Sequence, residues 1–100
     1  MKLMDLSEIR NYLGSGITLA LGGQSINMNP VGLTKELLRS NCNNLSLIAA
    51  PVGGFAADIL IGAELVRSFE FAQSSFWEYG LAPNMRRFSE EGRIICNEHT

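Results

Sequence analysis

The sequence predicts an α/β fold, an open and mainly parallel sheet with helices on its faces. Two almost entirely apolar runs, residues 17–21 and 45–50, are typical of strands in a parallel sheet. Segments with helical spacing alternate with such runs over short connections, as right-handed crossovers require. One hundred residues are enough for one small domain, so we expect a single domain over residues 1–100.

The first helix is predicted to begin after Asp5. Asp5 and Glu8 have the spacing of a capping box, in which side chains bond free N–H groups of the first turn. Apolar residues then recur at helical spacing, and Gly14 is a natural position for the helix to end. Strand 17–21 follows, and its lack of polar residues predicts burial on both of its faces.

The second helix is predicted to be capped by Asn29 and to have Pro30 as its first residue, where the missing N–H of proline costs least. Its spacing separates an inward stripe from a solvated side. The residues expected to face the core are Val31, Thr34, Leu37 and Leu38. Those expected to face water are Lys35, Glu36 and Arg39.

Strands and helices continue to alternate along the rest of the chain. The expected order is strand 45–50 ended by Pro51, helix 55–63, strand 65–72, loop 73–81, a helix from Pro83 to Gly92, and strand 94–96. Because side chains alternate along a strand, Phe69 and Phe71 are expected to share one face of strand 65–72.

Composition excludes several classes of protein. The net charge is −2 and the eight Lys and Arg residues are scattered, which argues against a nucleic-acid interface. No apolar run reaches the ~18 residues of a membrane-spanning helix. Asp5 interrupts the start before a signal-peptide core, so we expect a cytoplasmic protein. In that reducing compartment Cys42 and Cys96 are expected to be free thiols.

Several common kinds of site are also excluded. The glycines around Ser15 precede a strand, whereas a dinucleotide-binding loop follows one, and no phosphate-binding Gly-Lys-Ser/Thr occurs. His99, the single histidine, lies next to the end of the chain and lacks an orienting partner for catalysis. No group of residues has metal-ligand spacing. We therefore expect no metal and no catalytic role for His99.

The ends of the predicted strands are the candidate binding site. In open α/β sheets ligands bind beyond the carboxyl ends of the strands, and glycines there let backbone N–H groups approach a ligand. A tight turn is the alternative for the glycine pairs, and simple turn residues are the alternative for the two serines. The candidate residues are Gly22, Gly23, Gln24, Gly53, Gly54, Ser74 and Ser75.

The first of these stretches resembles the amino-terminal motif of the family I coenzyme A transferases. The matching residues are Gly16, the apolar triplet Leu19-Ala20-Leu21, Gly22, Gly23 and Pro30. Three positions depart from that motif: Ser15, Gln24 and Met28. A second match, over residues 60–67 and 78–87, is similar to the A (alpha) subunit of glutaconate-type and 3-oxoacid-type transferases. The resemblance implies a truncated coenzyme A transferase fold, the amino-terminal portion of an A subunit.

The resemblance also implies a function. Such a subunit or fragment would help to move coenzyme A between an acyl-CoA and a carboxylic acid, through a glutamyl-CoA thioester on a partner B subunit. Coenzyme A would be a substrate and no other cofactor is implied, and we expect a hetero-oligomer or self-association. Glu78 precedes Tyr79 and Gly80 in a pattern like that of the nucleophile. It lies within the stretch that matches the A subunit, which does not supply the nucleophile, so the resemblance implies no catalytic residue in this chain. The alternatives are a CoA-ester hydrolase subunit of the same fold and a non-catalytic truncated remnant.

Overall fold

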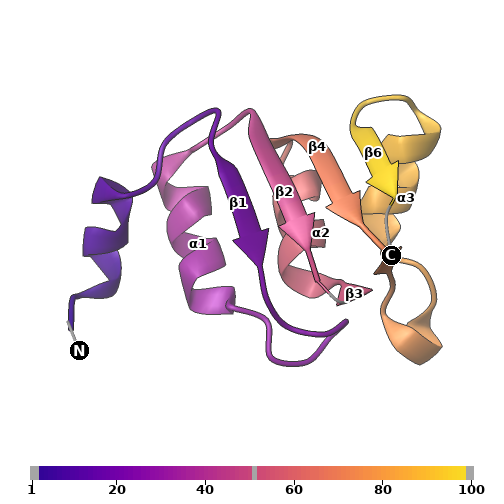
Figure 1. Cartoon of the computed structure of the whole chain (residues 1–100), viewed down its shortest axis with the longest axis horizontal. Coiled ribbons are helices and arrows are strands. Elements are labelled where there is room, and N and C mark those ends of the chain that lie inside the picture. The colour runs from indigo at the N-terminus through magenta and orange to yellow at the C-terminus, as the bar shows by residue number, and fades with distance from the viewer. Residues whose placement is uncertain (1–2, 51, 99–100) are drawn as a thin grey trace.

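The computed structural model describes residues 3–50 and 52–98, which form an α/β fold with a parallel sheet (Figure 1). In this part of the chain four parallel strands pair in the order β1-β2-β4-β6. Their bounds are Thr18–Leu21 for β1, Leu45–Ala49 for β2, Val66–Phe71 for β4 and Ile95–Glu98 for β6. The predicted fold class is confirmed.

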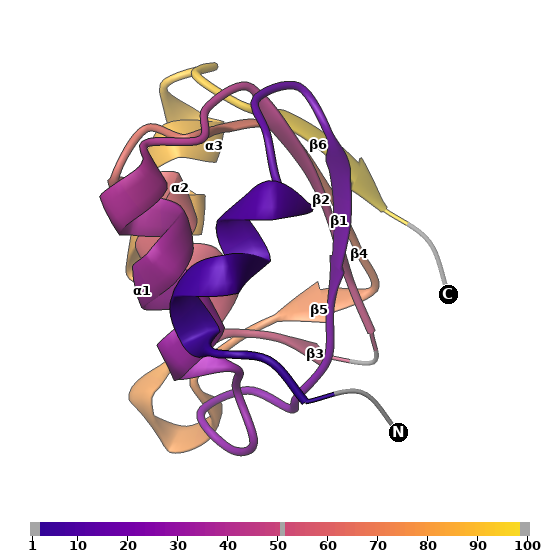
Figure 2. The same cartoon turned by 90° about the vertical axis from the view of Figure 1, so that its left-hand side faces the viewer.

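The helices lie on one face of this sheet (Figure 2). They are η1, a 3-10 helix over Leu6–Asn11, and the α-helices α1 over Val31–Ser40, α2 over Phe55–Gly62 and α3 over Pro83–Glu90. Each new strand is added on the same side of the one before it. Right-handed crossovers then place every connecting helix on the same face.

The core lies between the sheet and these helices. One row of register partners faces it: Leu19, Leu47, Phe69 and Cys96. Leu47 and Phe69 are fully buried, and the ring of Phe71 stacks on that of Phe69, so the shared face predicted for the two phenylalanines is confirmed. A neighbouring row points to the opposite face, which no helix of the described residues covers: Ala20, Ile48, Glu70 and Asn97.

Strand β1 is not buried on both faces, contrary to the prediction. Thr18 and Ala20 are exposed, and Leu19 and Leu21 are only half-buried. The reason is its position, because β1 is at the edge of the sheet and only one face is covered. An apolar strand sequence indicates a parallel sheet but does not distinguish a central strand from an edge strand.

The first helix also differs from the prediction. It is a 3-10 helix without buried residues, and Asp5 precedes it without a side-chain cap. The backbone N–H of Glu8 bonds the backbone carbonyl of Asp5 at 3.0 Å, so the capping box does not form. An ion pair between Arg10 and Glu36, at 3.0 Å, ties this helix to α1.

Glu36 is the main correction within α1. It was expected to face water, but it is 3% exposed and its carboxylate lies between Arg10 and Arg39. Thr34 and Leu37 are buried as predicted. The hydrophobic spacing of the helix is thus correct, while the burial of the acid depends on a partner from η1.

Two predicted loops contain short paired segments. β3, over Val52–Gly53, pairs in parallel with β5, over Gln73–Ser74, and η2, a 3-10 turn over Trp77–Tyr79, follows. Two-residue strands have no detectable periodicity, so only their pairing defines them. Cys42 and Cys96 are free thiols, as predicted. His99 and Pro51 lie outside the described residues.

Candidate functional site

Three loops meet at the carboxyl edge of the sheet, where β1, β2 and β4 end. Gln24, after β1, forms a parallel bridge with Val52 of β3. Gly53 of β3 is the register partner of Ser74 of β5, after β4. The structure thus brings candidate residues from all three loops together, although they are up to 50 residues apart in sequence.

Ser25 connects the three loops, and sequence reasoning missed it. It is fully buried, and its hydroxyl donates a hydrogen bond of 2.6 Å to the carbonyl of Ser75. Its backbone N–H bonds the carbonyl of Val52 at 3.1 Å, and its own carbonyl accepts the N–H of Phe55 at 3.1 Å. A serine next to a glycine pair looks like any turn residue in sequence, so no local signal identifies this role.

Gly53 and Gly54 are required by close packing. A Cβ on Gly54 would lie 2.1 Å from the carbonyl oxygen of Ser25, and one on Gly53 would lie 2.8 Å from the ring of Phe69. The second glycine pair therefore lets the loop after β1 and the core approach the start of α2. Both glycines are buried, so they lie in the interior beneath the candidate site rather than at its surface.

Gly22 and Gly23 occupy different environments. Gly23 has φ +103°, and a Cβ there would lie 2.8 Å from the carbonyl oxygen of Met28, within the same loop. Gly22 is exposed, and a Cβ there would meet nothing within 4 Å. Neither N–H donates a hydrogen bond to another described residue, whereas the N–H of Gln24 bonds the carbonyl of Asn27 at 2.9 Å. Of the expected donor edge, the two glycine N–H groups are the ones that the loop itself leaves available.

Ser74 and Ser75 are not exposed turn residues. They are 3% and 5% exposed, and the N–H of Ser75 bonds the carbonyl of Gly53 at 3.0 Å. The Ser75 hydroxyl accepts a hydrogen bond of 3.2 Å from the Gln73 amide. Among the described residues the Ser74 hydroxyl has no hydrogen-bond partner.

Asn29 helps to fix the site, but not in the way predicted. It does not cap α1, which has Pro30 at its N-cap position without a side-chain bond. Its side-chain oxygen instead accepts the N–H of Ala56, in the first turn of α2, at 3.0 Å. Its amide donates to the carbonyl of Ser25 at 2.8 Å. Sequence indicated a capping residue at this position, and only the structure shows which helix it caps.

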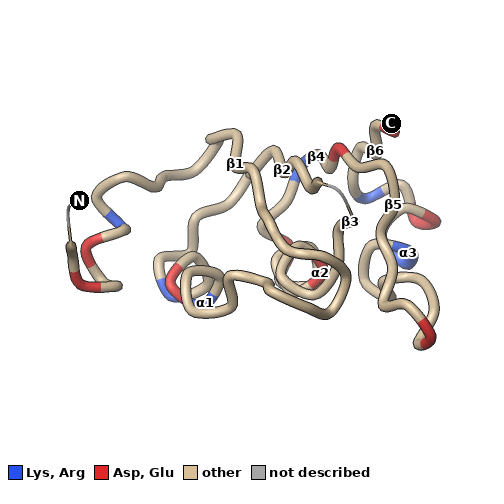
Figure 3. Tube along the Cα trace, turned by 60° about the horizontal axis from the view of Figure 1, so that its bottom comes forward, with Lys and Arg blue, Asp and Glu red and all other residues tan. Residues whose placement is uncertain are grey.

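The carboxyl edge is almost free of charge (Figure 3). Residues 11–34 and 40–57, which include two of the three loops, contain no charged side chain. Side chains already bond first-turn N–H groups of two helices. Asn29 accepts the N–H of Ala56 in α2, and Asp58 accepts those of Asn84 and Met85 in α3. Backbone dipoles, rather than charged side chains, would therefore dominate the interaction with a ligand at this edge.

Among the described residues, the two groups whose pKa values are shifted, Glu36 and Arg93, lie away from this edge. Hydrogen bonds from Arg39 and then Arg10 hold the pKa of Glu36 below its ordinary value, against the opposing effect of burial. The hydrogen bond with Glu91 above all raises the pKa of Arg93. Glu78 lies in η2 and is exposed, a position typical of a solvated carboxylate.

Over residues 3–50 and 52–98 no three His, Cys, Asp or Glu side chains gather as metal ligands. Within the same ranges no helix has the length and apolar character needed to cross a bilayer.

Comparison with known proteins identifies the fold. No protein-family model matches the chain, and no curated protein matches its sequence. The structure of glutaconate coenzyme A-transferase from Acidaminococcus fermentans matches 97% of the chain with a TM-score of 0.86 and 25% identity. A variant of the decarboxylase AibA/AibB matches 97% of it with a TM-score of 0.86 and 24% identity. The chain spans 31% and 38% of those two chains, and over this portion it has a coenzyme A-transferase-like fold.

Proposed function

We propose that this chain is the amino-terminal portion of a coenzyme A transferase A subunit, which acts with a B subunit that carries the nucleophilic glutamate. The observation that carries the proposal is the match to glutaconate coenzyme A-transferase over 97% of the chain. It agrees with two sequence matches, one at residues 16–30 and one over residues 60–67 and 78–87, that resemble the same kind of subunit.

In this proposal the chain supplies one wall of the active site. The partner's glutamate attacks the acyl-CoA thioester, and coenzyme A then passes from the resulting glutamyl-CoA thioester to an acceptor acid. The N–H groups of Gly22 and Gly23 face the acyl oxygen and stabilise its developing negative charge. The buried framework of Ser25, Gly54 and Ser75 holds that loop rigid, so the donors need no rearrangement during the reaction.

Co-expression with a B subunit of the glutaconate type tests the proposal. The purified pair is supplied with acetyl-CoA and a series of mono- and dicarboxylic acids, and transfer of coenzyme A is followed. We expect exchange by the pair, none by either chain alone, and none if the B subunit's glutamate is replaced. Turnover by this chain alone that disappears in Glu78→Ala would instead assign the nucleophile to Glu78. A pair that assembles without turnover would support the non-catalytic alternative.

A decarboxylase shares this fold, and we propose decarboxylation as a second reaction class to be tested. The same wall would then stabilise charge during carbon–carbon cleavage of a CoA ester, with release of carbon dioxide. The same preparation distinguishes the reactions, because transfer requires an acceptor acid, hydrolysis releases free coenzyme A without one, and decarboxylation releases carbon dioxide with the thioester intact.

A further inference from the structure

The edge of the sheet at β1 is open and uncharged. Among the described residues β1 pairs with β2 alone, and this strand contains no charge, no proline and no register shift. No charged side chain occurs anywhere in residues 11–34. Proteins usually protect an edge strand with such features, because its unpaired backbone groups can pair with another strand. The β1 edge lacks these protections and is therefore available to a further strand.

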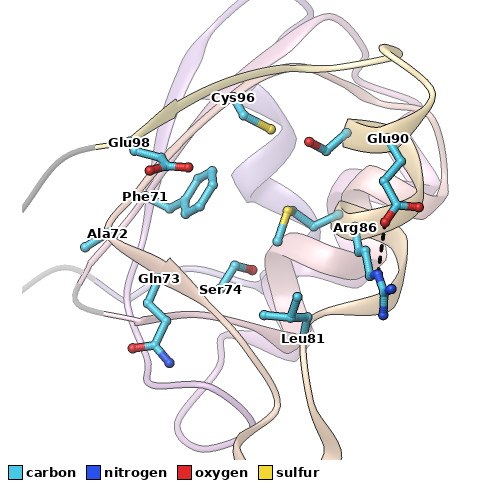
Figure 4. Close-up of a pocket in the computed structure, with 11 residues that line it drawn as sticks. Phe71, Ala72, Gln73, Ser74, Leu81, Arg86, Glu90, Cys96 and Glu98 are labelled. Carbon is cyan, nitrogen blue, oxygen red and sulfur yellow. Dashed lines mark hydrogen bonds and ion pairs between the residues drawn. The ribbon is translucent and has the colours of Figure 1, made fainter.

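The opposite edge, at β6, is protected by charge. β6 contains Glu98 and follows Arg93, which forms an ion pair with Glu91 at 3.2 Å. The groove that β6 helps to form is lined by Glu98 and by the ion pair of Arg86 with Glu90 on α3 (Figure 4). The two edges of the sheet therefore differ, and β1 is the one suited to strand addition.

Backbone groups of Thr18 and Ala20 point out of the β1 edge. The carbonyl of Ile17 accepts the N–H of Ser46, in β2, at 3.0 Å, so the backbone groups of Ile17 face β2. Along a strand, the backbone groups of successive residues point alternately to the two neighbouring positions in the sheet. The N–H and C=O groups of Thr18 and Ala20 therefore face away from β2, where an added strand would meet them.

An apolar hollow of about 300 Å³ lies beside this edge, on the side of the helices. The half-buried Leu19 and Leu21 of β1 line it, together with Ile9 and Leu13 from the first helical segment and Leu33 from α1. None of the residues that line it is charged. Because alternate side chains of a strand point to the same face, a strand added beside β1 would direct every second side chain toward this hollow.

η1 lies over the position of such a strand. This indigo helix extends beyond both α1 and β1 on their side of the molecule (Figure 1), and it lies between the layer of α1 and that of the sheet (Figure 2). It has no buried residue, and the ion pair of Arg10 with Glu36 joins it to α1 rather than to β1. A single extended segment would fit beneath η1, whereas a whole second copy paired through β1 would bring η1 of each copy against the helices of the other.

We propose that the β1 edge binds an extended segment of a different polypeptide, which adds as a further strand beneath η1. The segment is uncharged and has apolar side chains at alternate positions. Its backbone bonds that of Thr18 and Ala20, and its apolar side chains enter the hollow beside Leu19 and Leu21. In strand addition the main-chain hydrogen bonds give affinity, and pockets for alternate side chains give specificity. This inference does not depend on the proposed function.

Binding of a synthetic peptide to the full chain tests the proposal. The probe is a capped peptide of alternating threonine and leucine, and the control has lysine in place of leucine. We expect the leucine peptide to slow hydrogen exchange at the N–H groups of Thr18 and Ala20 at least tenfold, without change in β6. The lysine peptide should bind at least tenfold more weakly, because it cannot fill the hollow with apolar side chains. Equal binding of the two peptides, no binding of the leucine peptide, or unchanged exchange at Thr18 and Ala20 would overturn the proposal.

Variants distinguish this edge from other exposed apolar positions. Ala20→Pro removes an outward N–H, a change that an edge strand tolerates, and should abolish binding of the leucine peptide. Leu33→Glu places a charge in the hollow and should weaken binding at least tenfold. Leu81→Glu is the matched control, because Leu81 is also partly exposed but lies outside the hollow, and it should leave the affinity unchanged. Thermal unfolding verifies that each variant is folded, and full binding by folded Leu33→Glu or Ala20→Pro would contradict the proposal.

Sedimentation of the chain alone tests the other occupant, a second copy. We expect no dimer that the leucine peptide dissociates. A dimer that the peptide dissociates and that Ala20→Pro abolishes would assign the β1 edge to self-association and refute its assignment to a different polypeptide.

Discussion

The carboxylate of Asp58, on α2, accepts a hydrogen bond of 2.7 Å from the backbone N–H of Met85, in the first turn of α3. It also accepts the N–H of Asn84 at 3.2 Å, while α3 has no side-chain cap from its own N-cap residue. In the same way, Asn29 caps α2 from the loop after β1. Each of these two helices is therefore capped by a side chain that lies 26 or 27 residues earlier in the sequence, and these contacts hold the carboxyl edge together.

Replacing Asp58 should destabilise the fold. Asp58→Ala leaves the buried N–H of Met85 without a partner, and we expect a loss of about 2 kcal/mol in the free energy of unfolding. Urea denaturation of the full chain measures it. Glu90→Ala removes only an exposed ion pair with Arg86 and should change that free energy by less than about 0.5 kcal/mol. A similar effect in the two variants would show that Asp58 is not a cap.

Asn29 should contribute more to the stability of the fold than the nearby Asn27. Asn29→Ala removes the cap of α2 and the bond to the Ser25 carbonyl, and we expect a loss of about 1–2 kcal/mol. Asn27 is exposed and takes part through its backbone, so Asn27→Ala should change the stability little. Thermal unfolding of both variants makes the comparison, and an equal decrease in Tm would refute the proposed cap.

Gly23 should be intolerant of any side chain for structural reasons. Gly23→Ala combines the positive φ of +103° with a Cβ that lies 2.8 Å from the Met28 carbonyl oxygen. We expect a loss of stability of more than about 1 kcal/mol. Gly22→Ala, in open space, should change it by less than about 0.5 kcal/mol. Tm values of the two variants decide the point.

Gly22 is therefore the better probe of the proposed donor edge. Gly22→Val is expected to assemble normally with the partner subunit, but the added side chain would keep a ligand from the free N–H groups. Loss of one preorganised donor typically lowers the rate by 10²–10³. Unchanged specific activity of the assembled variant would remove Gly22 from the site.

The ion-paired Glu36 should make stability depend on pH in the acid range. Its pKa is lowered in the folded chain, chiefly by the hydrogen bond from Arg39 and then by that from Arg10. The unfolded chain then binds the proton more tightly, so the stabilisation is complete above the ordinary glutamate pKa of about 4.3 and is lost as pH falls through the lowered value. We expect Glu36→Gln to reduce the loss of stability between pH 5 and pH 3. An identical pH profile in the variant would contradict this assignment.

The alternation of strands and helices followed from local sequence. The predicted strands 45–50 and 65–72 correspond to β2 and β4 within one residue at each end, and α3 begins at Pro83 as predicted. These elements have strong local signals: continuous apolar runs, alternating aromatics and a proline at the first turn. The glycine pairs also have a local signal, because each pair follows a predicted strand. The sequence does not distinguish the strained Gly23 from the open Gly22.

Sequence by itself thus determined the class of fold, the order of its elements and the loops that carry the candidate site. Tertiary structure decided that β1 is an edge strand, that Glu36 is buried, that Asn29 caps α2 rather than α1, and that Ser25 joins three loops. The physical reason is the range of the interactions. Periodicity and turn chemistry act over a few residues, whereas the hydrogen bond from Ser25 to Ser75 spans 50 residues and exists only after the sheet has formed.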